Sequence, residues 1–172
     1  MRWLIGENIP GFGAIRHMQD PSSFGAPDGM TSSLYENADD NSRAWDQGDV
    51  HSNSGVNNKA AYLMTDGGTF NGKTVKRLGI TKVAKIYYEA QTNLFASAND
   101  YRNLYAALRW SCANLTGTSG VTSANCQEVK DAVDATETNV VPPTQSPEPR
   151  GTRLQHRPDG HQPLQRQLGE PL

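Results

Sequence analysis

The chain has 172 residues, of which 35% are apolar, a formal net charge of -2 and a pI near 6.1. A chain of this length and apolar content buries one core rather than two, so we expect one folded domain. Lys and Arg are scattered along a slightly acidic chain, which excludes the basic field that nucleic-acid binding requires. No apolar run approaches the roughly 20 residues that cross a bilayer, and the N-terminus MRWLIGENIP lacks the features of a signal peptide.

The first 50 residues show little hydrophobic periodicity and are predicted to form an irregular region. Glycines, prolines and an acidic cluster at Glu36, Asp39 and Asp40 interrupt this segment every few positions. Large apolar and aromatic side chains nevertheless recur through it, namely Trp3, Ile5, Ile9, Phe12, Ile15, Met18, Phe24, Tyr35 and Trp45. Because ordered loops of this length usually line a site, we expect the region to pack against something and to be functional.

Helical periodicity begins at Ser54 and predicts a small bundle. The first helix is expected to run from Ser54 to the pair Gly67-Gly68, where a helix typically stops. Three more are expected at about residues 81–94, 100–115 and 123–135, with Asn99 as the N-cap of the third helix of the chain. The predicted fold class is therefore mainly α, with a long ordered loop region followed by a small helical bundle.

The composition changes sharply after Val141. The remaining stretch holds seven of the ten prolines, no aromatic residue, and many Gln and Arg residues. Such a segment cannot bury enough apolar surface to offset its chain entropy. We therefore predict a folded domain over residues 1–140 and a disordered Pro/Arg/Gln-rich tail over residues 141–172, which is either a linker or an out-of-frame translation.

The two cysteines bracket a connection rich in Gly, Ser and Thr. Cys112 and Cys126 lie at the facing ends of two predicted helices and are candidates for a disulfide. A loop of about 15 residues closed in this way contributes about 3 kcal/mol in the chain-entropy model, and such bonds persist in oxidising compartments. Two unrelated buried thiols are the alternative.

One histidine lies between an acidic loop and an amphipathic helix. The segment DQGDVHSNSGVNNKAAY places His51 on a predicted turn at a helix entrance, close in sequence to Asp46 and Asp49. A histidine beside carboxylates suits proton transfer or hydrogen bonding to an oxyanion, because the carboxylate orients the ring and stabilises imidazolium. Taken without any resemblance, the residues favour a structural histidine that caps a turn.

Several strings of this sequence resemble one family in the same order. D-x-G-x-V-H-x-N-S-G, followed by N-K-A-A-Y-L and G-G-T, resembles the active-site histidine segment of the thermolysin-like (M4 family) neutral zinc metalloendopeptidases. Upstream, AIRHMQDP resembles the substrate-binding arginine segment of the family, and WLIGENI resembles the stretch that precedes it. Downstream, KIYYEAQTNLFASANDYRNLYAAL and VKDAVDA follow the last helices of the family. The resemblance covers about residues 2–138 and implies the helical C-terminal domain of such a peptidase.

The resemblance assigns a catalytic role to His51. It implies that His51 donates a hydrogen bond to the tetrahedral intermediate while an aspartate holds the other ring nitrogen. Asp46 matches the position of this aspartate in some members and Asp49 its position in others. Both stay open as the orienting partner, with a slight preference for Asp46.

The resemblance also assigns substrate-binding residues. Arg16 is implied to bind the substrate carbonyl just beyond the scissile bond, a role that suits a forked and permanently charged donor. Ile15 would line an apolar pocket for the residue that follows the cut. A structural ion pair between Arg16 and Asp20 is the alternative to the binding role.

The family's metals are not accounted for by this sequence. Catalytic zinc is held there by H-E-x-x-H and a further Glu, whereas no pair of histidines here has that spacing on a helix: His17, His51, His156 and His161. Zinc is therefore expected in a missing N-terminal half. For calcium, Glu7 matches a ligand position in some members, but Arg2 stands where the pattern has an acidic residue.

The leading prediction is thus the C-terminal part of a secreted zinc metalloendopeptidase, inactive without its N-terminal half and acting on peptide or protein substrates. The resemblance and the cysteine pair both indicate an extracellular protein. The alternative is a non-catalytic helical module that binds peptides or inhibits a peptidase. A purely structural helical domain is disfavoured, because it leaves the long ordered loop region without a purpose.

Overall fold

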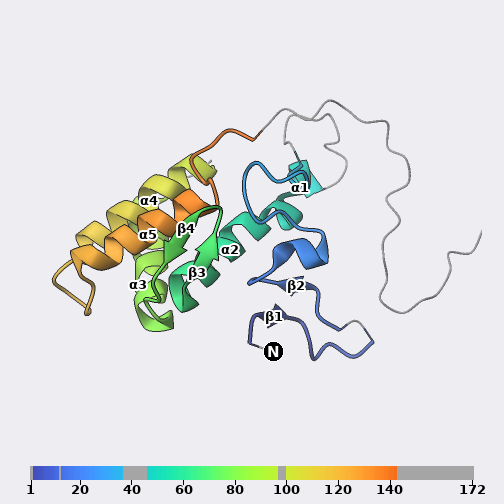
Figure 1. Ribbon diagram of the computed structural model, residues 1–172, viewed down its shortest axis with the longest axis horizontal. Coiled ribbons are helices and arrows are strands. Elements are labelled where there is room, and N and C mark those ends of the chain that lie inside the picture. The colour runs from blue at the N-terminus through green and yellow to red at the C-terminus, as the bar shows by residue number, and fades with distance from the viewer. Residues whose placement is uncertain (1, 12, 37–45, 97–99, 143–172) are drawn as a thin grey trace, which may run out of the picture.

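The computed structural model describes residues 2–11, 13–36, 46–96 and 100–142, and the side chains at 46–48 are not among those described. The elements in chain order are β1 (Leu4–Ile5), β2 (Arg16–His17), the 3-10 helix η1 (Pro21–Phe24), α1 (Asp46–Asn53), α2 (Gly55–Asp66), β3 (Gly68–Phe70), β4 (Lys73–Val75), α3 (Ile80–Glu89), the π-helical segment η2 (Ala90–Leu94), α4 (Tyr101–Asn114) and α5 (Ser123–Ala135). The prediction of a mainly helical fold is confirmed. Figure 1 shows α3, α4 and α5 together at one end, α2 running through the middle, and β1, β2 and α1 at the other end.

The core lies where α2, α3, α4 and α5 pack together with β4. The largest side chains that are fully buried there are Leu63, Met64, Ile86, Leu108, Val129 and Val133. Together with smaller buried residues such as Ala60, Val83, Cys112 and Ala132, they recur at spacings of three and four along their helices, so one stripe of each helix faces the core. Each side chain of this size contributes about 1.5–3 kcal/mol on burial, which explains why the helical periodicity of the sequence predicted this part of the fold.

Most helix boundaries agree with the sequence, but one cap differs, and the helix predicted at about residues 81–94 is divided into α3, which ends at Glu89, and the π-helical η2, which ends at Leu94. Gly67 ends α2 with a φ of 78°, and α5 occupies the predicted residues. The N-cap of α4 is Asp100, which corrects the prediction of Asn99. The Asp100 carboxylate accepts a hydrogen bond from the Asn103 amide at 2.8 Å, and the Asn103 side chain accepts one from the Asp100 amide at 3.0 Å. A reciprocal box of this kind fixes the start of the helix better than a single polar residue one position earlier.

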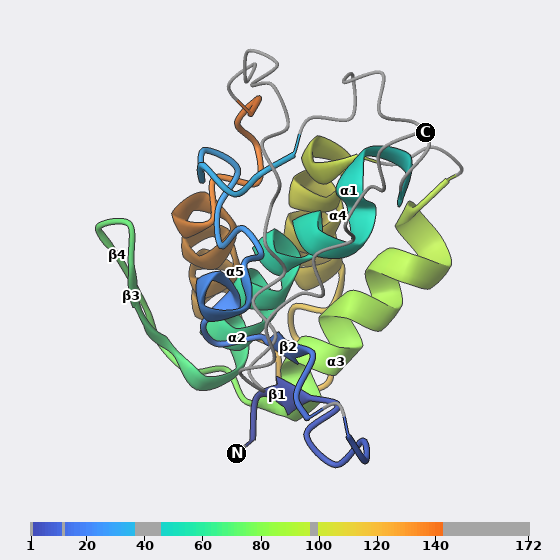
Figure 2. The same cartoon turned by 90° about the vertical axis from the view of Figure 1, so that its right-hand side faces the viewer.

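A β-hairpin between α2 and α3 was not predicted. It pairs Gly68 with Val75 and Phe70 with Lys73, and it projects beside α5 (Figure 2). The turn is formed by Asn71 and Gly72, both with positive φ, at 44° and 73°. Asn-Gly is the preferred pair for such a tight turn, so the sequence carried a local signal for this hairpin.

The first 50 residues contain more regular structure than the sequence suggested. β1 and β2 form an antiparallel pair in which Leu4 lies opposite His17 and Ile5 opposite Arg16. Two-residue strands are too short to show an alternating pattern, which is why the sequence revealed no periodicity here. The segment also contains η1 and the start of α1, so the predicted irregular region includes short regular elements.

Long-range hydrogen bonds attach this N-terminal region to the bundle. The indole of Trp3 donates to the Asp66 carboxylate at 2.7 Å, and Arg2 forms an ion pair with the same carboxylate at 3.0 Å. Further along, the backbone amide of Thr31 donates to the Glu137 carboxylate at 3.0 Å, just beyond the end of α5. The region is therefore ordered by contacts with α2 and with the residues that follow α5.

A disulfide joins α4 to α5. Cys112 and Cys126 are bonded, with their Cα atoms 5.4 Å apart and a sequence separation of 14. Cys112 is fully buried in the core, so the bond fixes the end of α4 against the start of α5.

The predicted tail falls largely on residues 143–172, which lie outside the described residues. The division of the chain at residues 140 and 141 therefore stays a prediction. Within the part of the chain that the structure describes, no helix has the length and apolar character needed to span a membrane.

A charged cluster on α5 gives the fold a pH-dependent contribution. Burial would raise the pKa of Asp134, but hydrogen bonds from Lys130 and Tyr105 and the charge of Lys73 together lower it below its usual value. A carboxyl with a lowered folded-state pKa stabilises the fold above its unfolded-state pKa, and this stability is lost as the pH falls through the folded-state pKa.

We therefore expect Asp134→Asn to lower the free energy of unfolding by about 1 kcal/mol at neutral pH and by less near pH 2.5, where more of the carboxyl is protonated. Urea unfolding at the two pH values measures this difference. Asp131→Asn is the matched control, because the Asp131 carboxylate lies 3.9 Å from Lys73 and should matter less. An equal loss at both pH values would show that Asp134 acts through packing rather than charge.

Candidate functional site

His51 lies in the last turn of α1 and is exposed. The structure corrects the predicted turn at a helix entrance, since the helix already begins five residues earlier, at Asp46. α1 was not predicted from the sequence because it has no stripe of apolar side chains. Its one large apolar residue, Val50, is 52% exposed. A short polar helix of this kind shows no periodicity that would distinguish it from a loop.

The two aspartates proposed to orient His51 both belong to α1. Asp46 is its first residue, and its side chain is not among those described. Asp49 has a φ of 57°, a left-handed conformation that Asp tolerates better than most residues. Which carboxylate orients the His51 ring stays a prediction.

Arg16 reaches from β2 to the end of α1. Its Nη1 atom donates to the backbone carbonyl of His51 and, at 2.9 Å, to the hydroxyl of Ser54. The Ser54 hydroxyl donates to the same His51 carbonyl at 2.6 Å. Among the described residues no salt bridge joins Arg16 to Asp20, whose carboxylate instead accepts a hydrogen bond from a neighbouring serine. The structure thus brings Arg16 and the backbone of His51 into direct contact.

Asn53 holds the end of α1 in place and was missed by sequence reasoning. Its side chain is buried, with 6% exposed, and its amide donates to the Glu36 carbonyl at 2.7 Å while its oxygen accepts from the Glu36 amide at 3.1 Å. The Asn53 carbonyl accepts a hydrogen bond from the Tyr101 hydroxyl at 2.6 Å. Burial, and secondarily the nearby Tyr35, raises the pKa of Tyr101, so this hydroxyl stays protonated and donates.

These contacts come from residues far apart in the sequence. Asn53 and Glu36 are 17 residues apart, and Tyr101 lies 48 residues beyond Asn53. The string H-x-N-S-G contains Asn53, but no local pattern indicates what its amide contacts. Only the folded arrangement shows that the turn carrying His51 is anchored to the preceding loop and to α4.

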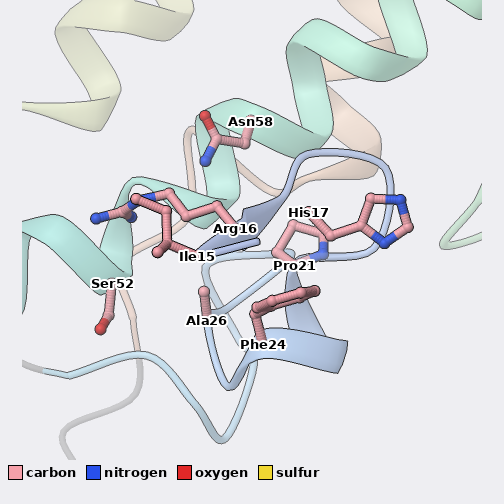
Figure 3. A pocket seen from close by; sticks show the side chains of 8 residues that line it. All are labelled: Ile15, Arg16, His17, Pro21, Phe24, Ala26, Ser52 and Asn58. Atoms are coloured by element: carbon pink, nitrogen blue, oxygen red, sulfur yellow. The ribbon is translucent and has the colours of Figure 1, made fainter. Parts of the chain in front are cut away.

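A pocket of about 110 Å³ lies beside the junction of α1 and α2. Its lining combines apolar and polar side chains: Ile15, Arg16, His17, Pro21, Phe24, Ala26, Ser52 and Asn58. Figure 3 shows the Arg16 side chain extending to the same side as Ser52, while the His17 ring points the other way and lies near Phe24. Ile15 is 49% exposed and Phe24 43%, so apolar surface is open to solvent next to Arg16.

The described residues do not form a metal site. Among them, no three His, Cys, Asp or Glu side chains cluster closely enough to hold an ion. His17 and His51 belong to different elements, and His156 and His161 lie outside the described residues. Glu7 is exposed in the turn after β1, so any calcium ligand role for it depends on other carboxylates and stays a prediction.

Comparison with known proteins identifies the class. Residues 1–138 match the family model of the thermolysin metallopeptidase alpha-helical domain, so the protein is a metallopeptidase domain. The chain belongs to the thermolysin-like M4 metallopeptidase family, as its C-terminal helical domain, which confirms the resemblance found in the sequence.

The relatives define how much of such a peptidase this chain represents. It is 46% identical over 140 residues to a zinc metalloproteinase of Renibacterium salmoninarum, covering 78% of this chain and 25% of that protein. It is 42% identical over 137 residues to a bacillolysin of Brevibacillus brevis, covering 77% of this chain and 24% of that protein. It is 39% identical over 137 residues to a thermolysin of Alicyclobacillus acidocaldarius, covering 77% of this chain and 23% of that protein. The chain therefore spans about a quarter of the length of these relatives.

Proposed function

We propose that this chain forms one wall of the substrate cleft of a secreted zinc endopeptidase and cleaves peptide bonds only together with a zinc-bearing N-terminal half. The observation that carries the proposal is the contact between Arg16 and the His51 carbonyl, which places the proposed substrate-binding and transition-state residues side by side. The domain would comprise residues 1–140, with residues 141–172 as a disordered tail.

His51 is proposed to stabilise the transition state. The side chain is exposed at the end of α1. A ring N–H group in this place can donate a hydrogen bond to the oxyanion of a tetrahedral intermediate. Asp46, or otherwise Asp49, would hold the second ring nitrogen and fix the orientation of the ring.

Arg16 and Ile15 are proposed to bind the substrate. A guanidinium has five N–H donors, and the contacts with His51 and Ser54 use only one of its nitrogens, which leaves donors for a substrate carbonyl. Ile15 lies next to Arg16 in the pocket lining and is half exposed. An apolar wall in this position favours a bulky hydrophobic side chain after the scissile bond.

The exposed apolar side chains of the N-terminal region support a second half. Ile5, Ile9, Ile15 and Phe24 are all exposed on the segment that precedes α1. Apolar side chains gathered in one region of a surface are typical of a face that another part of the protein covers. We propose that the N-terminal half of the peptidase packs on this face.

The metals are proposed to be held mainly by that half. Zinc, once bound there, supplies the Lewis acid that activates water in such peptidases, while Glu7 would contribute one oxygen to a calcium ion. Export is supported by the disulfide between Cys112 and Cys126, since such bonds persist in oxidising compartments.

The proposal is tested by joining the chain to the zinc-bearing part of the Renibacterium salmoninarum zinc metalloproteinase. We expect the fused protein to cleave a peptide with a bulky apolar residue after the scissile bond, and to lose this activity with a chelator. The separate chain should show no cleavage. A fused protein that folds and holds zinc but cleaves nothing would contradict the proposal, and inhibition of the intact relative by the separate chain would favour an inhibitory module.

A further inference from the structure

Ser54 occupies the N-cap position of α2 but does not cap this helix. Its φ of -56° and ψ of -16° are helical, and its side chain makes no capping hydrogen bond. At an N-cap, a serine hydroxyl ordinarily accepts a hydrogen bond from a backbone amide of the first turn. Here the hydroxyl turns back toward α1 and Arg16, so it serves another purpose.

The chemistry of its neighbours fixes the direction of both Ser54 hydrogen bonds. A guanidinium can only donate, so the Ser54 oxygen accepts from Arg16 Nη1, at 2.9 Å. A carbonyl can only accept, so the Ser54 proton points to the His51 oxygen, at 2.6 Å. A single hydroxyl therefore uses its donor on one candidate site residue and its acceptor on the other.

The junction itself is held by other residues. The Asn53 side chain forms two hydrogen bonds with Glu36, and the Asn53 carbonyl accepts one from Tyr101. The backbone of Ser54 also continues the helical pattern, since its amide donates to the Val50 carbonyl at 3.1 Å. Loss of the Ser54 hydroxyl should therefore leave the fold intact and change only what the hydroxyl contacts.

We propose that Ser54 is a positioning residue that sets the placement of Arg16 relative to His51. The hydroxyl gives Arg16 Nη1 a second acceptor besides the His51 carbonyl, which restricts the guanidinium to one position. The same hydroxyl restrains the last turn of α1, on which the His51 ring is carried. The kinetic consequence of this placement rests on the proposed function, whereas the placement itself does not.

Nuclear magnetic resonance of the full 172-residue chain tests the placement without any need for activity. Ser54→Ala should shift the side-chain nitrogen and proton signals of Arg16 and the ring signals of His51, and Ser54→Thr should restore them. Ser23→Ala is the matched control, because the Ser23 hydroxyl also donates to the carbonyl three residues earlier, at 2.7 Å, but forms no hydrogen bond with Arg16 or His51. Unchanged Arg16 and His51 signals in Ser54→Ala would overturn the proposal.

The fused peptidase described above tests the consequence. Since hydrogen bonds to charged groups are among the stronger ones, we expect Ser54→Ala to lower kcat/KM about tenfold, Ser54→Thr to recover most of it, and Ser23→Ala to change it less than about twofold. The melting temperature should be unchanged. In an Arg16→Ala background the same Ser54→Ala change should cost only about threefold, because the shared contact is already lost.

The outcomes separate the two proposals. Equal losses from Ser54→Ala in both backgrounds, or no recovery with threonine, would overturn the positioning role while leaving the peptidase function standing. A fused protein without any activity would overturn the proposed function, and the resonance signals of the separate chain would still decide the placement.

Discussion

Replacing His51 by alanine is expected to lower kcat/KM of the fused peptidase by about 10²–10³-fold, the usual effect of removing one hydrogen-bond donor from an oxyanion. The proposed donor is the exposed ring, while the contacts with Arg16 and Ser54 use the backbone carbonyl of the same residue. The substitution therefore removes the donor and leaves those backbone contacts in place. Initial rates at substrate concentrations well below KM measure the effect directly.

The control for this substitution lies on the same helix. Val50 is exposed one residue earlier, so Val50→Ala should change kcat/KM less than about twofold. A donor that acts only in the transition state should lower kcat with KM nearly constant. If His51→Ala retained activity within about threefold of the parent, or raised KM alone, the transition-state role would be wrong.

A helix could be predicted from the sequence only where it buries one stripe of apolar side chains. Val83 and Ile86 on α3 and Val129 and Val133 on α5 are buried at spacings of three and four. α5 was expected at its observed bounds, and α3 together with η2 covers the helix predicted at about residues 81–94. α1 was not predicted, because a polar helix on the surface carries no such pattern. The Asn-Gly turn of the β3–β4 hairpin is a local sequence signal for a hairpin, but only helices were predicted in this region.

The candidate site could be predicted only in part, and its prediction rested on resemblance to a family rather than on hydrophobic periodicity. His51 and Arg16 were singled out because the strings around them resemble a family, not because the residues alone reveal a site. The contact between them joins positions 35 residues apart, and the Arg16–Ser54 contact joins positions 38 residues apart. Local patterns carry no information about pairs this distant, so the roles of Ser54 and Asn53 emerge only from the fold.

Gly55→Ala is expected to destabilise the domain by about 3 kcal/mol or more, at the upper end of what overpacking costs. A Cβ atom on Gly55 would lie 2.3 Å from the Pro27 carbonyl oxygen and 3.0 Å from the Ala26 side chain. The oxygen belongs to the backbone, so it cannot rotate away as a flexible side chain would. The segment after η1 would have to move off α2, which urea unfolding should detect as a lower transition midpoint.

Gly117→Ala is the control that distinguishes the steric overlap at Gly55 from the general cost of replacing a glycine. Gly117 has a φ of 82° and no atom within 4 Å of its would-be Cβ, so the change should cost only about 1 kcal/mol of backbone strain. Gly55 immediately follows Ser54, and moving the segment around Pro27 displaces the junction that carries His51. We therefore expect Gly55→Ala to reduce kcat/KM even under conditions in which the fused peptidase stays folded, whereas Gly117→Ala should not. A loss of stability for Gly55→Ala no larger than that for Gly117→Ala would contradict the close packing of the junction against Pro27.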